Sequence, residues 1–175
     1  MSIKIIMVYD QIQAGAGTKD DKMVPLSAKK EPIGPAIMMD SSLKKIDGRI
    51  IASIYCGNGT YLANADEVSR KICAMVNKLQ PDVVMCGPAF NFIDYAIMAA
   101  RVACDINKTT NVPAFAAMSI ENEETLVKYK DKVNIVITPK KGGIGLNDSL
   151  DNMCQLAKAL VSKEDATSLT NRICF

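Results

Sequence analysis

The alternation of short β-branched strands with amphipathic helices constrains this chain most. Five apolar runs bounded by Gly, Pro, Asp or Thr are typical of buried strands, at residues 3–9, 49–56, 82–86, 112–118 and 133–138. Helical spacing of apolar residues follows the later four, at about residues 64–80, 91–107, from 121 onward and 147–161. This order predicts a parallel sheet with right-handed crossovers. We therefore expect an α/β fold, a three-layer α/β/α sandwich with a mainly parallel, about five-stranded sheet, flavodoxin-like or Rossmann-like.

The length of the chain and its loops set the domain organisation. A chain of 175 residues, 49% of them hydrophobic, can form one core of ordinary size, so we expect a single domain over residues 1–175. Residues 11–35 contain three Gly and three Pro without sustained periodicity, which predicts a long loop that is functional or mobile. Residues 162–175 show only weak periodicity.

Composition excludes several classes of function. The net charge of +2 and the absence of Trp argue against nucleic-acid binding, and no apolar stretch is long enough for a membrane span. Six Cys without a Cys-x-x-Cys pair or a signal peptide indicate reduced thiols in a cytoplasmic protein. Because the chain has no His, imidazole catalysis and His-based zinc sites are excluded, and we expect no metal site. The binding partners that remain are a small substrate or another protein.

The expected fold also places the working site. Ligands of parallel α/β sheets bind at the carboxyl ends of the strands, near the point where the strand order reverses. This rule selects five loops, at residues 10–35, 56–61, 86–95, 118–124 and 138–146.

Cys56 closes the second strand and begins one of these loops. It is followed by Gly57 and Asn58, so backbone amides could surround its sulfur, lower its pKa and make it a catalytic thiolate. The same residue type is also among the most often buried, and Cys56 then fills the sheet edge beside an ordinary turn. Both interpretations stay open from the sequence.

Three other loops carry groups with two interpretations. Gly87, Pro88 and Asn91 stand at a strand-to-helix connection, where helix amides could hold an anion, but Gly and Pro also suit such a turn sterically. The acidic residues within 121–124 could bind a metal, act as a base, or stabilise a helix dipole. The lysines at 140–141 attract an anionic ligand or solvate a turn.

Several of these segments together resemble one known family. They are AGAG at residues 14–17, EPIGP at residues 31–35, CGNGTY at residues 56–61, PDVVMCGPAFN at residues 81–91, and the segment from Pro113-Ala114 to Glu121-Asn122. In this order they are similar to the selenocysteine-containing, substrate-specific subunit of component B in clostridial glycine, sarcosine and betaine reductases. The resemblance covers roughly residues 3–160.

The resemblance implies a function. The chain would be a subunit of, or a paralogue related to, an oxidoreductase that reductively cleaves the C–N bond of a small amine or amino-acid-like substrate. Other reductase subunits would be its partners, and one of them would carry the pyruvoyl group that captures the substrate amine. The implied site residues are Cys56 as a catalytic thiol and, for substrate binding, Gly57, Asn58, Gly87, Pro88, Asn91, Glu121 and Asn122.

The sequence also departs from the family pattern. It contains no selenocysteine, Asn58 stands where the family has Asp, and the family's aromatic pair is reduced to Tyr61. We therefore expect the selenocysteine, like the pyruvoyl group, on a partner chain and no cofactor in this one. A homo-oligomer that pairs through exposed helices is a further expectation. The alternative function is a non-catalytic ligand-binding or protein-interaction α/β domain.

Overall fold

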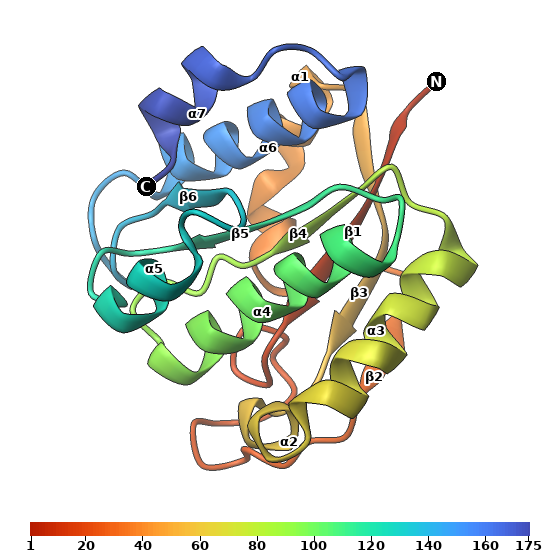
Figure 1. The fold of residues 1–175 in the computed structure, drawn as a ribbon, viewed down its shortest axis with the longest axis vertical. Coiled ribbons are helices and arrows are strands. Elements are labelled where there is room, and N and C mark those ends of the chain that lie inside the picture. The colour runs from red at the N-terminus through yellow and green to blue at the C-terminus, as the bar shows by residue number, and fades with distance from the viewer.

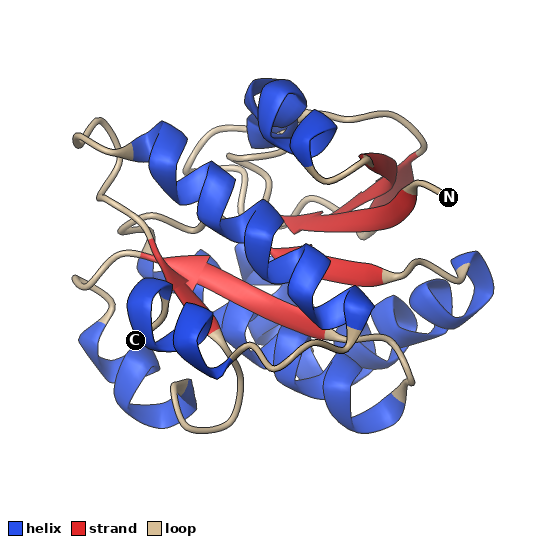
Figure 2. Cartoon of the chain, turned by 90° about the horizontal axis from the view of Figure 1, so that it is seen from above, coloured by secondary structure: helices blue, strands red, loops and turns tan.

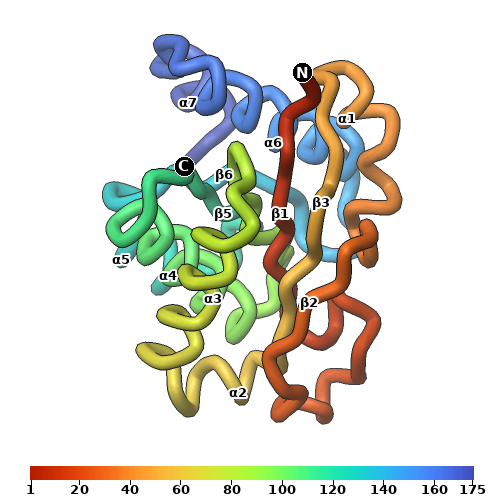
Figure 3. Tube along the Cα trace, turned by 90° about the vertical axis from the view of Figure 1, so that its right-hand side faces the viewer, coloured from red at the N-terminus to blue at the C-terminus, as the bar shows by residue number.

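Six strands form one sheet at the centre of the protein. The computed structural model describes all 175 residues. Its strands are β1 (Ile3–Tyr9), β2 (Ser27–Lys29), β3 (Gly48–Tyr55), β4 (Val83–Cys86), β5 (Ala114–Met118) and β6 (Ile135–Ile137). They lie in the order β2-β3-β1-β4-β5-β6, and β1, β2 and β3 run side by side in Figure 3.

The strand order defines the type of sandwich. The five strands other than β2 pair in parallel, and taken in chain order they follow the flavodoxin-like arrangement 2-1-3-4-5. The mainly parallel α/β sandwich is therefore confirmed. The sheet has six strands rather than five because β2, within the expected loop of residues 11–35, pairs antiparallel with β3 at the edge.

Helices cover both faces of the sheet (Figures 1 and 2). The helical segments are η1 (Gly34–Met39), α1 (Asp40–Lys45), α2 (Asn58–Ala63), α3 (Ala65–Leu79), α4 (Ile93–Thr109), α5 (Glu123–Tyr129), α6 (Leu146–Ser162) and α7 (Thr167–Ile173). The helices α1 and α6 pack together on one face, whereas α4 packs against α2, α3 and α5 on the other. None of these helices has the length and apolar character that crossing a membrane requires.

The helix with neighbours on most sides is α4, which also packs against β4 and β5 of the sheet. Its small buried residues Ala99, Ala100 and Ala103 allow close approach of neighbouring elements, and Met98 is fully buried. Burial of a side chain of this size contributes about 1.5–3 kcal/mol. The run of small and apolar residues in this helix therefore reflects packing on more than one side.

The long loop after β1 folds back onto the start of α2. The amide of Gly57 donates to the carbonyl of Val24 at 2.8 Å, and the amide of Thr60 donates to the carbonyl of Lys22 at 3.0 Å. A Cβ atom at Gly57 would lie 1.9 Å from the Lys22 carbonyl oxygen. Glycine is therefore needed at Gly57 for close backbone approach rather than for an unusual dihedral angle.

Gly57→Ala tests this contact. The added methyl group must displace the backbone at Lys22, and overpacking of this kind typically costs about 1–3 kcal/mol. The control is Gly142→Ala, where φ is +78° but no atom lies within 4 Å of the added Cβ. Urea denaturation should show the larger loss of unfolding free energy for Gly57→Ala. Equal losses would mean that the loop does not press on Gly57.

Candidate functional site

The chain reverses its winding at β1, which has β3 on one side and β4 on the other. Crossovers on opposite faces leave a crevice beyond the carboxyl ends of such a strand pair. In Figure 1 the carboxyl ends of β1 and β3 lie toward the bottom of the view, near α2. The loops that follow β1, β3, β4 and β5 meet along this edge. They contain seven of the eight residues that the sequence predicts for the site, and the eighth, Asn58, begins α2.

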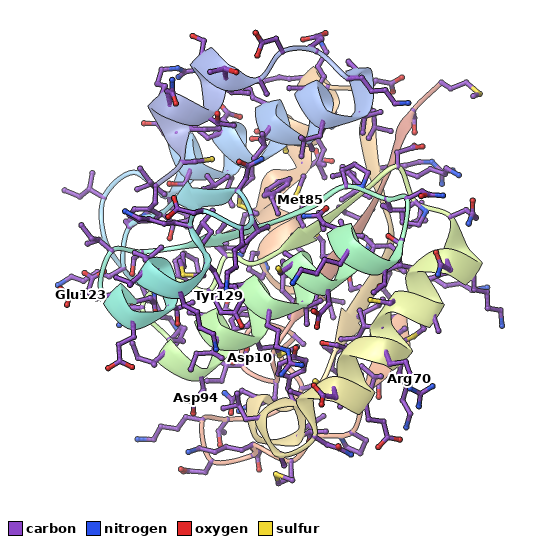
Figure 4. The ribbon with its side chains drawn as sticks, viewed as in Figure 1. Asp10, Arg70, Met85, Asp94, Glu123 and Tyr129 are labelled. Atoms are coloured by element: carbon purple, nitrogen blue, oxygen red, sulfur yellow. The ribbon has the colours of Figure 1, made fainter.

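A buried polar network fills the half of this edge beside β1 and β3. The Asp10 carboxylate accepts hydrogen bonds from the Gln13 amide at 2.9 Å and from Asn58 Nδ2 at 3.3 Å. The backbone amide of Asn58 donates to Gln11 Oε1 at 2.9 Å. Asp10 and Gln11 are fully buried, and Asp10 lies just above α2 in Figure 4. These bonds fix the loop after β1 to the first turn of α2.

The charge of Asp10 has no compensating cation. Burial raises the pKa of its carboxyl group, and hydrogen bonds from Gln13 and Asn58 oppose that rise only in part. Asp10 forms no salt bridge, and Asn58 Oδ1 has no hydrogen-bond partner. Asp10 and Gln11 are not among the residues that the sequence predicts for the site, although a carboxylate directly after a buried strand is a signal for Asp10.

Cys56 lies in the same half of the edge and is fully buried. Burial, and to a smaller extent the charge of Asp10, raises the pKa of its thiol to about 12. This is opposite to the lowering expected from the surrounding amides, because desolvation of the thiolate dominates. The environment therefore favours a packing role, and a catalytic role for Cys56 remains only a prediction.

The loop after β4 is shaped by close backbone contacts. Gly87 has φ of +139°, a Cβ there would lie 2.7 Å from the Ala117 carbonyl oxygen, and the peptide bond to Pro88 is cis. Asn91 Oδ1 accepts a hydrogen bond from the Lys141 amide at 2.9 Å, which connects this loop to the loop after β6. Gly87 and Asn91 thus have structural roles that do not require a ligand.

Asn122 connects the loops after β4 and β5. Its Nδ2 group donates to the carbonyls of Phe90 at 2.6 Å and Ser119 at 3.0 Å, so both of its hydrogens are used. The residue is only 1% exposed, yet its Oδ1 has no hydrogen-bond partner. Buried acceptors are normally paired, so this enclosed oxygen is an exception, and a buried water molecule is the usual partner of such a group.

Asn122 and Glu121 line a groove of about 470 Å³ between α4 and α5. Ile93, Ile97 and Tyr129 form its apolar part, and Glu123 and Tyr129 are labelled on α5 in Figure 4. No three acidic or Cys side chains converge in a way that could hold a metal ion. Of the eight predicted site residues, only Glu121 and Asn122 line this groove.

The family of the chain follows from its whole sequence. The family model of glycine/sarcosine/betaine reductase selenoprotein B (GRDB) matches residues 2–172. The chain belongs to this family. The resemblance inferred from the strand-end motifs is therefore confirmed.

Curated relatives agree with this membership. The chain is 26% identical over 161 residues to the sarcosine reductase complex component B subunit beta of Peptoclostridium acidaminophilum, covering 92% of this chain and 36% of that protein. It is 30% identical over 153 residues to the glycine reductase complex component B subunit gamma of Carboxydothermus hydrogenoformans, covering 87% and 34%. It is 21% identical over 161 residues to the betaine reductase complex component B subunit beta of P. acidaminophilum, covering 92% and 36%.

The chain thus spans about a third of the length of these GRDB relatives. No solved structure matches it significantly.

The raised pKa of Asp10 predicts a pH dependence of stability. The native state keeps this proton to higher pH than the unfolded chain, whose reference value is 3.8, so it binds more protons above about pH 4. The contribution of Asp10 to stability is therefore fully present below that pH and is lost as pH rises through the raised pKa. Asp10→Asn should remove this loss, so its unfolding free energy relative to wild type should increase from pH 4 to pH 7 in urea titrations.

Asp20→Asn is the matched control for this experiment. Asp20 is exposed in the same long loop, and its carboxylate makes none of these bonds. Identical pH profiles for Asp10→Asn and wild type would contradict a raised Asp10 pKa.

Cys56 should resist alkylation in the folded protein. A pKa of about 12 instead of 9.0 reduces the thiolate fraction roughly 1000-fold at neutral pH. Iodoacetamide labelling at pH 7.5, followed by peptide mass spectrometry, should therefore modify Cys56 far more slowly in native protein than in protein unfolded with urea. Fast labelling of Cys56 in the native protein would instead support its interpretation as a reactive thiolate.

Proposed function

We propose that this chain is a subunit of, or a paralogue related to, a glycine/sarcosine/betaine-type reductase, and that its carboxyl-end loops hold a small amine substrate. The observation that carries the proposal is the groove beside the loops after β4 and β5, which Glu121 and Asn122 both line. Membership of the GRDB family supplies the reaction class, reductive C–N cleavage, in which such a substrate takes part.

The nucleophile of this reaction comes, in our proposal, from another chain. The thiols at this edge belong to Cys56 and Cys86, both are buried, and burial raises the pKa of each well above its usual value. The sequence contains no selenocysteine. These residues do not fit a selenolate-type step, so we assign this chain substrate binding and assign the selenocysteine and the pyruvoyl group to partner chains.

A second function, a non-catalytic ligand-binding or protein-interaction domain, is favoured by one observation. Asp10, Gln11 and Asn58 bond to one another and to the loop rather than facing open solvent. In this interpretation the edge beside β1 and β3 is purely structural. The two functions differ in whether reductase subunits accompany the chain.

Affinity purification from the native host tests the proposal. The chain with a short tag should bring down other reductase subunits, identified by mass spectrometry, and removing it from an extract should lower amine-dependent reductase activity. An extract from the untagged strain is the control. Recovery of the chain without reductase subunits, and with activity unchanged by its removal, would favour the non-catalytic domain.

A further inference from the structure

Exposed isoleucines gather at the half of the carboxyl edge that contains the groove between α4 and α5. Met118 and Ile137 are paired at the ends of β5 and β6, so the loops that follow these strands start side by side. The exposed isoleucines are Ile93 at the start of α4, Ile120 after β5 and Ile144 after β6. We call these three residues and the adjoining groove the isoleucine face. Exposed apolar surface of this kind marks sites of protein interaction.

Ile144 projects from the isoleucine face on a well-defined turn. The amide of Gly143 donates to the carbonyl of Lys140 at 2.9 Å, which closes the turn before Ile144. Gly145, with φ of +102°, follows and precedes the first residue of α6. The side chain of Ile144 is 100% exposed. An apolar side chain held in water in this way gains free energy when a second surface covers it.

The turn that carries Ile144 is attached to one wall of the groove. The amide of Lys141 donates to Asn91 Oδ1 at 2.9 Å, and Lys141 Nζ lies 5.5 Å from the centroid of the Phe92 ring. Asn91 and Phe92 directly precede Ile93, which lines the groove. In Figure 1 the loop after β6 lies on the same side of the molecule as α5. The projecting Ile144 and the groove are therefore neighbours on one face.

The charges of this face are divided between the groove and the turn. The charged residues that line the groove are three acids and one base, Glu121, Glu123, Glu124 and Lys128. The turn carries the exposed bases Lys140 and Lys141. None of these side chains forms a salt bridge within the chain. Opposite charges that are unpaired in one chain can pair across an interface, where they fix its orientation.

A second copy of the chain is complementary to this face. In a two-fold symmetric pair each contact occurs twice, so a projecting side chain and a groove on the same face complement each other. Ile144 of each copy can then cover the apolar wall of the other groove, which Ile93 and Ile97 form. The same arrangement brings the lysines beside Ile144 toward the acidic side of that groove. Shape, apolar surface and charge therefore select a second copy.

We propose that two copies of this chain pair through the isoleucine face, with Ile144 of each copy packed on the apolar wall of the other copy's groove. The groove of about 470 Å³ is within the size range of small-molecule sites, so a side chain on one wall leaves room beside Glu121 and Asn122. The dimer thus closes the groove. That the closed groove is the substrate site rests on the proposed function, whereas the pairing itself does not.

Sedimentation velocity over a range of protein concentrations tests the pairing. The wild-type chain should form dimers, and Ile144→Asp should raise their dissociation constant about tenfold or more, because it places a charge against an apolar wall. Ile144 is fully exposed, so the variant should keep the wild-type circular dichroism spectrum. The control is Ile37→Asp, at an exposed isoleucine of η1 outside this face. A monomeric wild type, or equal effects of the two substitutions, would overturn the proposal.

Charge reversal tests the orientation of the two copies. Lys140→Glu and Glu124→Lys each bring like charges together in a homodimer, and each should weaken dimerisation about fivefold. An equimolar mixture of the two variants should regain wild-type affinity, because each chain then meets opposite charges at both symmetric contacts. Recovery in the mixture also shows that both variants are folded. A mixture that associates as weakly as the separate variants would contradict this orientation.

The outcomes separate this inference from the proposed function. A monomeric chain that co-purifies with reductase subunits would overturn the pairing alone, and loss of those subunits in Ile144→Asp would assign the isoleucine face to a reductase partner. A dimer that depends on Ile144 but brings down no reductase subunits would retain the pairing and overturn the reductase role.

Discussion

The hydrogen-bonded group of Asp10, Gln11 and Asn58 holds together the half of the sheet edge beside β1 and β3. Reversal of the winding at β1 leaves an opening beyond its carboxyl end, and a long loop and a short helix must close it. Isolated helices as short as α2 are unstable in water, so tertiary contacts must hold it. The three buried polar side chains supply such contacts. Their burial removes the Asp10 carboxylate from water, which is unfavourable for its charged form.

The strands were predictable because their local signal is strong. β4 and β5 are continuous apolar runs and β1 is interrupted only by Lys4, and parallel strands covered on both faces require such runs. The elements missed were β2, η1, α1, α2 and α7. β2 has only three residues, and its pairing of Ser27 with Tyr55 is set by tertiary contact rather than by composition. The short helix α2 is stabilised by buried Tyr61, whose hydroxyl lies 2.6 Å from that of Ser69.

The candidate site was predictable in place but not in chemistry. The strand-end rule placed Cys56 and Asn122 at one edge of the sheet, where the structure has them, because the rule depends only on strand order. Whether a thiol is activated depends on its burial, and the complete burial of Cys56 raises its pKa. Whether an amide is free depends on its partners, and only the folded loops show that Asn122 has a donor group in use and an acceptor left over.

The first turn of α4 connects the half of the edge beside β1 and β3 with the half that contains the groove. The buried Tyr95 hydroxyl donates to the carbonyl of Val8 at 2.6 Å. Val8 lies in β1, two residues before Asp10 of the buried polar network. Ile93, in the same turn of α4, lines the groove between α4 and α5 in the other half of the edge. Ligand sites are positioned most accurately on elements whose own side chains are locked by packing. The hydrogen bond from Tyr95 therefore ties the turn of α4 that lines the groove to β1, next to the buried network.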